Sequence, residues 1–216
     1  MYSCKDIDEW FKWKNTPDKI KDPISVEDQF KDYTEICGGE NQTDVLYNIL
    51  YLYAIGLYIK TRNDPNINYS VSIRIQKGTQ YLHSLNYINK NRDDDVDKCL
   101  NPLAKVYFSY GNLTVMWPGG NTLKGNGNNG YYDNPDIFFR RHKEWFFVLE
   151  KKRYAFLDVF VERIKNKNYE TLETFVDSFK DLREFADYIN GIVEIVNDRT
   201  EKIKEELKNS VYNNNN

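Results

Sequence analysis

One apolar stretch, Val45 to Ile59 (VLYNILYLYAIGLYI), constrains the fold of this chain more than any other feature. Because it is apolar on nearly every side of a helix, we expect it to form a buried helix at the centre of the fold. It is shorter than the about 20 residues that a membrane span requires. It also contains Asn48, Gly56 and four tyrosines, so no membrane helix is expected.

The ends of this central helix carry capping signals. Asn41 or Thr43 is predicted to cap its N-terminus, and Lys60 and Arg62 lie near its negative end. Before it, residues 3–15 have the spacing of a short amphipathic helix. Its repeating positions are Ile7, Trp10, Phe11 and Lys14.

The C-terminal part also reads as helical. Asn134 is a good N-cap and Pro135 a good first helical residue. We expect one helix from Pro135 to about residue 165, a second from about residue 169, and a long third helix that ends near residue 209.

The hydrophobic period changes from helical to two in the middle of the chain. Residues 69–76 alternate apolar and polar side chains, which predicts a strand with one buried face. Two further strands, about 105–110 and 113–117, flank Gly111-Asn112, which is a signal for a two-residue hairpin. The charged run at residues 89–97 (NKNRDDDVD) is interpreted as a surface loop.

These patterns predict an α+β fold that is predominantly helical, with a small antiparallel sheet (about 69–76, 105–110 and 113–117) packed on a helical bundle. The 216 residues suit a single domain, here 1–209. It would comprise a helical part (1–62), the sheet with a long loop (67–134) and a second helical part (135–209). Residues 210–216 are expected to be a disordered tail.

Charge and cysteine usage narrow the class of protein. A formal net charge of -3 does not favour binding to nucleic acid. The three cysteines show no disulfide framework and no apolar leader precedes the first helix, so a cytoplasmic protein is expected. With two histidines and no catalytic signature in the sequence, we assign no catalytic residue, metal site or cofactor, and the sequence leaves open whether the chain is an enzyme.

The long loop 118–133 contains a G-x-G-x-x-G pattern, which in a βαβ unit binds a dinucleotide pyrophosphate. Here the preceding strand ends well before the first glycine and no second parallel strand follows, so a Rossmann site is not expected. The glycines can still form a nest for an anion, and the next helix offers free N–H groups and positive side chains. The candidate ligand-binding residues are Trp117, Gly125, Gly127, Gly130, Tyr132, Arg141 and His142.

A more ordinary interpretation of the same loop stays open. The loop is then simply exposed, Arg141 pairs with a carboxylate, and His142 packs at the edge of the core.

The segment from Tyr110 to Phe146 resembles part of an uncharacterised bacterial family of unknown function. Trp117-Pro118-Gly119 matches the family's turn, and Arg141 matches an arginine on the helix that follows the loop. Asn129-Gly130 stands where the family often has Arg-Gly, which is a departure. The resemblance covers about a fifth of the chain, implies no activity, and favours a bacterial or phage protein.

Two functions are therefore expected from the sequence. The first is a non-catalytic interaction protein that uses an aromatic-rich helical surface to bind another macromolecule, with a protein partner preferred. An acidic inhibitor from a mobile element would be a special case. The alternative is a domain or enzyme that binds a small phosphate- or nucleotide-containing ligand through the 117–132 loop with Arg141 and His142.

Overall fold

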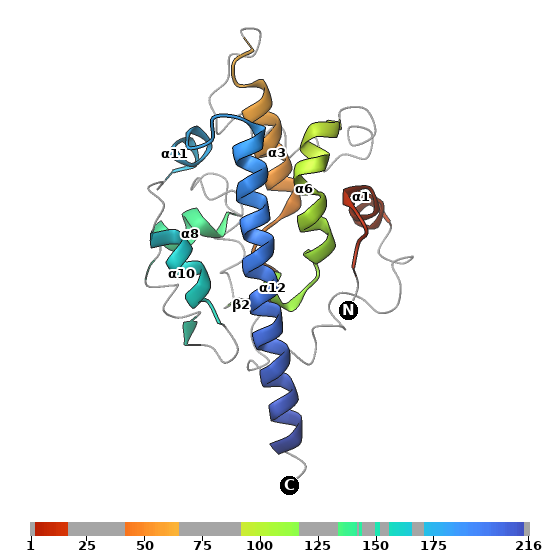
Figure 1. Cartoon of the computed structure of the whole chain (residues 1–216), viewed down its shortest axis with the longest axis vertical. Helices are drawn as coiled ribbons and strands as arrows, with labels where there is room; N and C mark the ends of the chain where they lie inside the picture. Colours follow the sequence, from red (N-terminus) through yellow and green to blue (C-terminus); the bar gives the residue numbers. More distant parts are fainter. Residues whose placement is uncertain are drawn as a thin grey trace.

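The structure is a computed structural model that describes residues 3–16, 42–64, 92–116, 134–141, 143, 150–151, 156–165 and 171–213. Its longest element, α12 (Leu182–Asn213), has 32 residues and spans about 48 Å. Figure 1 shows α12 along the long axis of the molecule, with α3 and α6 beside it and α1 outside α6. The shorter helices α8, α10 and α11 lie on the other side of α12.

The central apolar helix is confirmed, but it begins later than predicted. Helix α3 (Ile49–Thr61) buries residues on nearly all its sides. The side chain of Asn48, and not Asn41 or Thr43, caps it by accepting a hydrogen bond from the Leu50 N–H at 3.0 Å. In the described residues, no helix combines the length and apolar character needed to cross a membrane.

The predicted strand at 105–110 is wrong, and so is most of the described part of the predicted charged loop, because one helix begins at residue 94. Residues 89–91 of that loop lie outside the described residues. Helix α6 (Asp94–Val106) begins inside the acidic run, and Asp93 caps it by accepting from two N–H groups. Acidic side chains in its first turn interact favourably with the positive end of the helix dipole. The helical spacing of Val96, Leu100 and Leu103, all buried, outweighs the β-propensity of the residues that follow.

The sheet joins two segments that are far apart in the chain. Strand β1 (Gln42–Val45) pairs antiparallel with β2 (Leu113–Met116), in the register Gln42↔Met116 and Val45↔Leu113. The strand predicted at 113–117 is therefore confirmed, but its partner precedes α3. The Gly111-Asn112 hairpin is wrong, since both residues lie in the 3-10 helix η1 (Tyr110–Asn112). The strand predicted at 69–76 lies outside the described residues.

Asn112 explains why β1 lies against η1 and β2. Its buried side chain accepts a hydrogen bond from the Tyr47 N–H at 3.0 Å and donates to the Tyr47 and Tyr107 carbonyls. Its own carbonyl accepts from the Leu46 N–H. One amide side chain therefore holds the end of β1 against the segment that leaves α6.

The C-terminal helices largely follow the predicted pattern. Helix α8 (Pro135–Arg141) begins at the predicted cap, because Asn134 Oδ1 accepts from the N–H groups of Asp136 and Ile137. The single helix predicted to residue 165 is wrong. A separate helix, α10 (Asp158–Lys165), follows Phe156. Phe156 has a positive φ of 43°, and a right-handed α-helix cannot continue through a residue in that conformation.

Helix α11 (Leu172–Asp177) starts with a capping box between Thr171 and Thr174. Helix α12 ends at Asn213 and so extends beyond the predicted end near residue 209 into the expected tail. Taken together, the elements confirm a predominantly helical α+β fold with a small antiparallel sheet.

Helix α12 is joined to η1 by a close backbone approach. The Gly111 N–H donates to Thr200 Oγ1 at 2.9 Å, and the Thr200 hydroxyl donates to the Val196 carbonyl at 2.7 Å. Next to this contact, Arg199 is fully buried and donates to the carbonyls of Tyr110, Gly111 and Leu113. These carbonyls accept hydrogen bonds from the guanidinium of Arg199, whose positive charge would otherwise be costly to bury.

Candidate functional site

The predicted glycine-loop site lies mostly outside the described residues, namely Trp117, Gly125, Gly127, Gly130, Tyr132 and His142. Arg141 is described, and it is exposed in the last turn of α8. At the start of α8, two of the N–H groups expected to face an anion already donate to Asn134. The loop site therefore stays a prediction, with less support from the helix end than the sequence suggested.

A buried polar cluster lies directly after that loop, centred on Asp136. The Tyr47 hydroxyl donates to Asp136 Oδ1 at 2.6 Å, and the Tyr188 hydroxyl donates to Oδ2 at 3.1 Å. Arg163 Nε also donates to Oδ2, at 3.3 Å, and its guanidinium stacks 4.4 Å from the centre of the Tyr188 ring. We call these four residues the Asp136 cluster.

The Asp136 cluster connects four parts of the fold. Tyr47 comes from the link between β1 and α3, Asp136 from α8, Arg163 from α10 and Tyr188 from α12. Asp136 is 0% exposed, and both of its oxygens accept hydrogen bonds from groups within the fold. A buried carboxylate satisfied in this way acts as a structural junction between elements.

Tyrosine ionisation should report on this cluster. Burial, followed by the negative charge of Asp136, raises the pKa of Tyr47 and Tyr188 well above the ordinary value of 10.0. The fold favours the neutral hydroxyls, so their contribution to stability is complete below pH 10 and is lost as the pH rises through the folded-state pKa. We expect the free energy of unfolding to fall above pH 10, measured by urea denaturation across an alkaline pH series.

The control for this titration is Tyr47→Phe, which keeps the ring and removes one of the two hydroxyls. Its stability should be lower at neutral pH and should depend less steeply on pH above 10 than that of the wild type. Equal slopes for the two proteins would contradict the role given to Tyr47.

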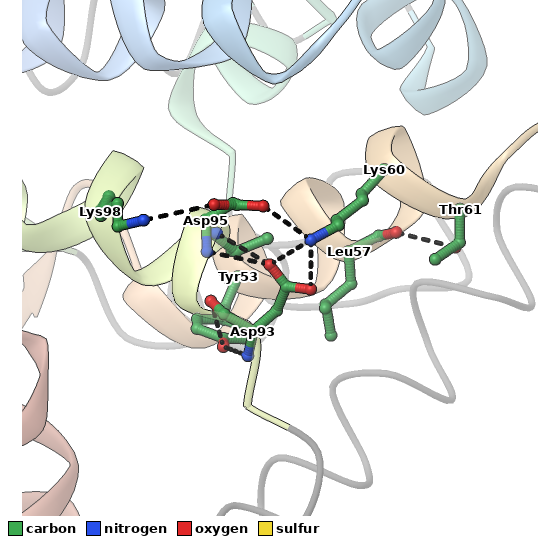
Figure 2. A network of polar contacts seen from close by, with 8 residues as sticks. Tyr53, Leu57, Lys60, Thr61, Asp93, Asp95 and Lys98 are labelled. Carbon is green, nitrogen blue, oxygen red and sulfur yellow. Dashed lines mark hydrogen bonds and ion pairs between the residues drawn. The ribbon is translucent and has the colours of Figure 1, made fainter.

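A second polar network lies at the surface, where the N-terminus of α6 meets α3 (Figure 2). Lys60 Nζ lies 2.7 Å from Asp93 Oδ2 and 2.9 Å from Asp95 Oδ2, and Lys98 pairs with Asp95 at 3.4 Å. The Tyr53 hydroxyl accepts a hydrogen bond from the Asp93 N–H at 2.7 Å. Hydrogen bonds with these carboxylates raise the pKa of Lys60, and the bond from Lys60 lowers the pKa of Asp95.

The chemistry of this surface network is that of an ion-paired helix cap. Lys60 supplies the positive charge between the two carboxylates, and Asp93 also accepts from backbone N–H groups of α6. Among the described residues, no group of three or more His, Cys, Asp or Glu side chains could hold a metal ion.

Neither of the two described cysteines has the chemistry of an activated thiol. Burial, reinforced by Glu9 and Asp6, raises the pKa of Cys4 to about 12. Burial also raises the pKa of Cys99, whose thiol donates to the Leu182 carbonyl at 3.7 Å. Thiolates are therefore scarce at both positions at neutral pH. Cys37 lies outside the described residues.

The aromatic surface expected from the composition is not found in the described part of the chain. Every aromatic side chain whose burial is described is buried or half-buried. They fill the core through contacts such as the edge-to-face pair of Phe175 in α11 with Tyr188 in α12. Phe179, in the link between these helices, meets Phe185 of α12 in the same way.

The solvent face of α12 instead carries a row of acidic side chains, which we call the acidic ridge. All five members are exposed, and their spacings of seven, four, three and four residues keep them on one helix face: Asp187, Glu194, Asp198, Glu201 and Glu205. Asn190 and Asn197 lie between them. Glu201 pairs with Lys204 at 2.7 Å, and the other four make no ion pair with any described residue.

The acidic ridge was missed at the level of sequence, although a signal for it was present. The long C-terminal helix was predicted, and a helical projection of its residues places these acids on one face without an intervening Lys or Arg. What the sequence did not show is which face of the helix meets solvent.

Comparison with known proteins adds no relative: no family model, curated protein or solved structure matches the chain. The resemblance of residues 110–146 to an uncharacterised family therefore stays a prediction.

Proposed function

We propose that this protein is a non-catalytic cytosolic interaction protein of bacterial or phage origin, and that its acidic ridge binds a protein partner with a basic surface. The row of carboxylates along α12, four of which make no ion pair with a described residue, is the observation that supports this proposal. From Asp187 to Glu205 the ridge is about 27 Å long, which is the scale of a protein–protein contact. The proposed origin rests on the resemblance of residues 110–146, and the proposed compartment rests on the cysteine pattern.

The ridge has an energetic cost in the isolated protein. Glu194 and Asp198 are four residues apart, and Asp198 and Glu201 are three residues apart. Like charges at these spacings destabilise a helix by about 0.2–0.5 kcal/mol per pair. Packing of the opposite face of α12 offsets this cost, and the positive side chains of a basic partner would offset it further by their attraction to the carboxylates.

The sign of the ridge also selects the class of partner. A nucleic acid would be repelled, because its phosphates carry the same charge as the ridge. Lys and Arg on a protein surface would be attracted, and this attraction mainly speeds association and weakens with added salt.

The test compares two double variants with the same net charge. Glu194→Gln with Asp198→Asn neutralises the middle of the ridge. Asp94→Asn with Asp177→Asn neutralises two exposed acids that lie elsewhere, on α6 and α11. Proteins retained by immobilised wild-type chain are identified by quantitative mass spectrometry, and the affinity of the leading candidate is then measured by calorimetry at two salt concentrations.

We expect the ridge variant to lose at least about tenfold in affinity, which corresponds to about 1.4 kcal/mol, while the control variant binds like the wild type. Equal losses in both variants would show that only net charge matters. A partner that binds the ridge variant normally would rule out the acidic ridge as its binding surface.

A further inference from the structure

Among the described helices, α1 (Ile7–Asn15) is the outermost on its side of α12, and in Figure 1 α6 lies between it and α12. It has nine residues, and Asp6 caps it by accepting from the Glu9 N–H at 2.9 Å. Isolated helices shorter than about 12–15 residues are marginal in water. The helical state of α1 therefore depends on the surface that it covers.

That surface is a row of three aromatic rings, and each of them contacts one aromatic ring of α1. Trp10 meets Tyr107 with centroids 5.2 Å apart, and Phe11 meets Tyr53 at 5.5 Å. Trp13 meets Phe108 at 4.6 Å. All three contacts are edge-to-face. We call Tyr53, Tyr107 and Phe108 the aromatic groove, with Tyr53 on α3 and the other two directly after α6.

Polar contacts fasten α1 at its N-terminal end. Arg92 pairs with Asp8 of α1 and with Asp97 of α6, and its guanidinium lies 4.9 Å from the centre of the Phe11 ring. The Ile7 N–H donates to Asn101 Oδ1 of α6 at 3.0 Å. Asp8 is exposed, so the Arg92–Asp8 pair is a latch at the rim of the contact rather than part of its core.

The covered state leaves one strong donor unsatisfied. Trp10 is 1% exposed, and its indole Nε1 has no hydrogen-bond acceptor in the structure. A buried donor without an acceptor opposes the gain from burying the ring, and release of α1 would return this N–H to water. Aromatic burial and the Arg92–Asp8 ion pair therefore favour the docked position of α1, whereas the unsatisfied indole N–H of Trp10 opposes it.

We propose that α1 is a displaceable cover of the aromatic groove, which opens as a unit separate from the α12 body, and that the opened groove binds α1 of a second copy of this chain. Each copy carries both the helix and the groove, so the exchange needs no new contact. Residues 17 to 41 join α1 to β1, and a chain of that length reaches at most about 80–90 Å. The connection thus permits α1 to act on a neighbouring molecule.

Hydrogen exchange on the full chain, followed by mass spectrometry, tests the first half of this proposal. Amides of α1 should exchange faster than those of Ile189 to Val196 in α12, with little dependence on denaturant. Arg92→Gln removes the latch and should speed the exchange of α1 by about threefold to tenfold while α12 stays unchanged. Lys60→Gln is the matched control, because Lys60 pairs with other carboxylates of the same helix end and does not pair with α1.

A labelled peptide of residues 3–16 tests the second half, by fluorescence anisotropy with the full chain. It should bind Asp8→Asn more tightly than wild type, because the chain's own α1 then lacks the ion pair with Arg92 while the peptide keeps Asp8. The factor should equal the change in α1 exchange that the same substitution causes. If α1 exchanges only through global unfolding together with α12, the cover is an integral part of the core and the proposal is overturned. If α1 opens separately but the peptide binds neither protein, the groove is not a helix-binding site. Neither result bears on the acidic ridge.

Discussion

Gly111→Ala is expected to lower the free energy of unfolding by about 4 kcal/mol or more, or to prevent folding. A Cβ at this position would lie 1.8 Å from the Val196 carbonyl oxygen and 2.6 Å from Thr200 Oγ1. Both atoms belong to α12, and the carbonyl is backbone, so no change of rotamer can relieve the clash. The helix and η1 would have to separate, which would also break the Gly111–Thr200 hydrogen bond and expose the carbonyls that satisfy Arg199.

Gly191→Ala, in α12, is the matched control. The nearest atom to its added Cβ is the end of a flexible side chain, Arg163 Nη1, at 3.1 Å. Alanine in a helix interior is favoured over glycine by about 1 kcal/mol, so this variant should be close to neutral or more stable. Urea denaturation of both variants measures the contrast. Similar midpoints would show that the close approach of η1 to α12 does not limit stability.

Asp136→Asn is expected to cost about 3–5 kcal/mol, although the two side chains have nearly the same shape. The carboxylate accepts from two tyrosine hydroxyls and from Arg163, and an amide offers only one acceptor oxygen. Its NH₂ group would face a donor, and the side chain of Arg163, 11% exposed, would lose its described carboxylate partner. The expected result is a large loss of stability and a weaker attachment of α8 and α10 to α12.

Asp158→Asn gives the comparison for this prediction. Asp158 lies at the start of α10, is 64% exposed and pairs with Lys202 at 3.4 Å. An exposed ion pair of this kind contributes between about 0 and 1 kcal/mol, so the variant should unfold close to the wild type. Equal costs for the two variants would mean that the charge of Asp136 is not what holds the cluster together.

Features that depend on neighbouring residues were accessible from the sequence. The amphipathic helix near the N-terminus, the buried helix after Asn48, the cap at Asn134 and the strand that starts at Leu113 were all predicted in kind. Their signals are hydrophobic period, capping side chains and proline, which act over a few residues. Errors arose where local signals competed, as at residues 105–110, where β-branched and aromatic residues continue a buried helical stripe.

The candidate sites depended on longer-range information. The glycine loop was predicted as a ligand site because its G-x-G-x-x-G pattern is local in the sequence, and this site stays a prediction. The Asp136 cluster draws on four segments, and in the sequence Asp136 resembles an ordinary acidic residue in a first helical turn. The acidic ridge required knowledge of which face of α12 the core covers.

The sequence by itself thus determined that the chain is predominantly helical, that the apolar stretch within residues 45–59 forms a buried helix, and where α8 begins, because adjacent side chains decide such features. Only the tertiary structure decided that β1 pairs with β2, that Gly111 must lack a side chain, and that Asp136 joins four elements. Each of these depends on atoms brought together across long stretches of chain. The hydrophobic period of one segment does not specify which distant segment will pack against it.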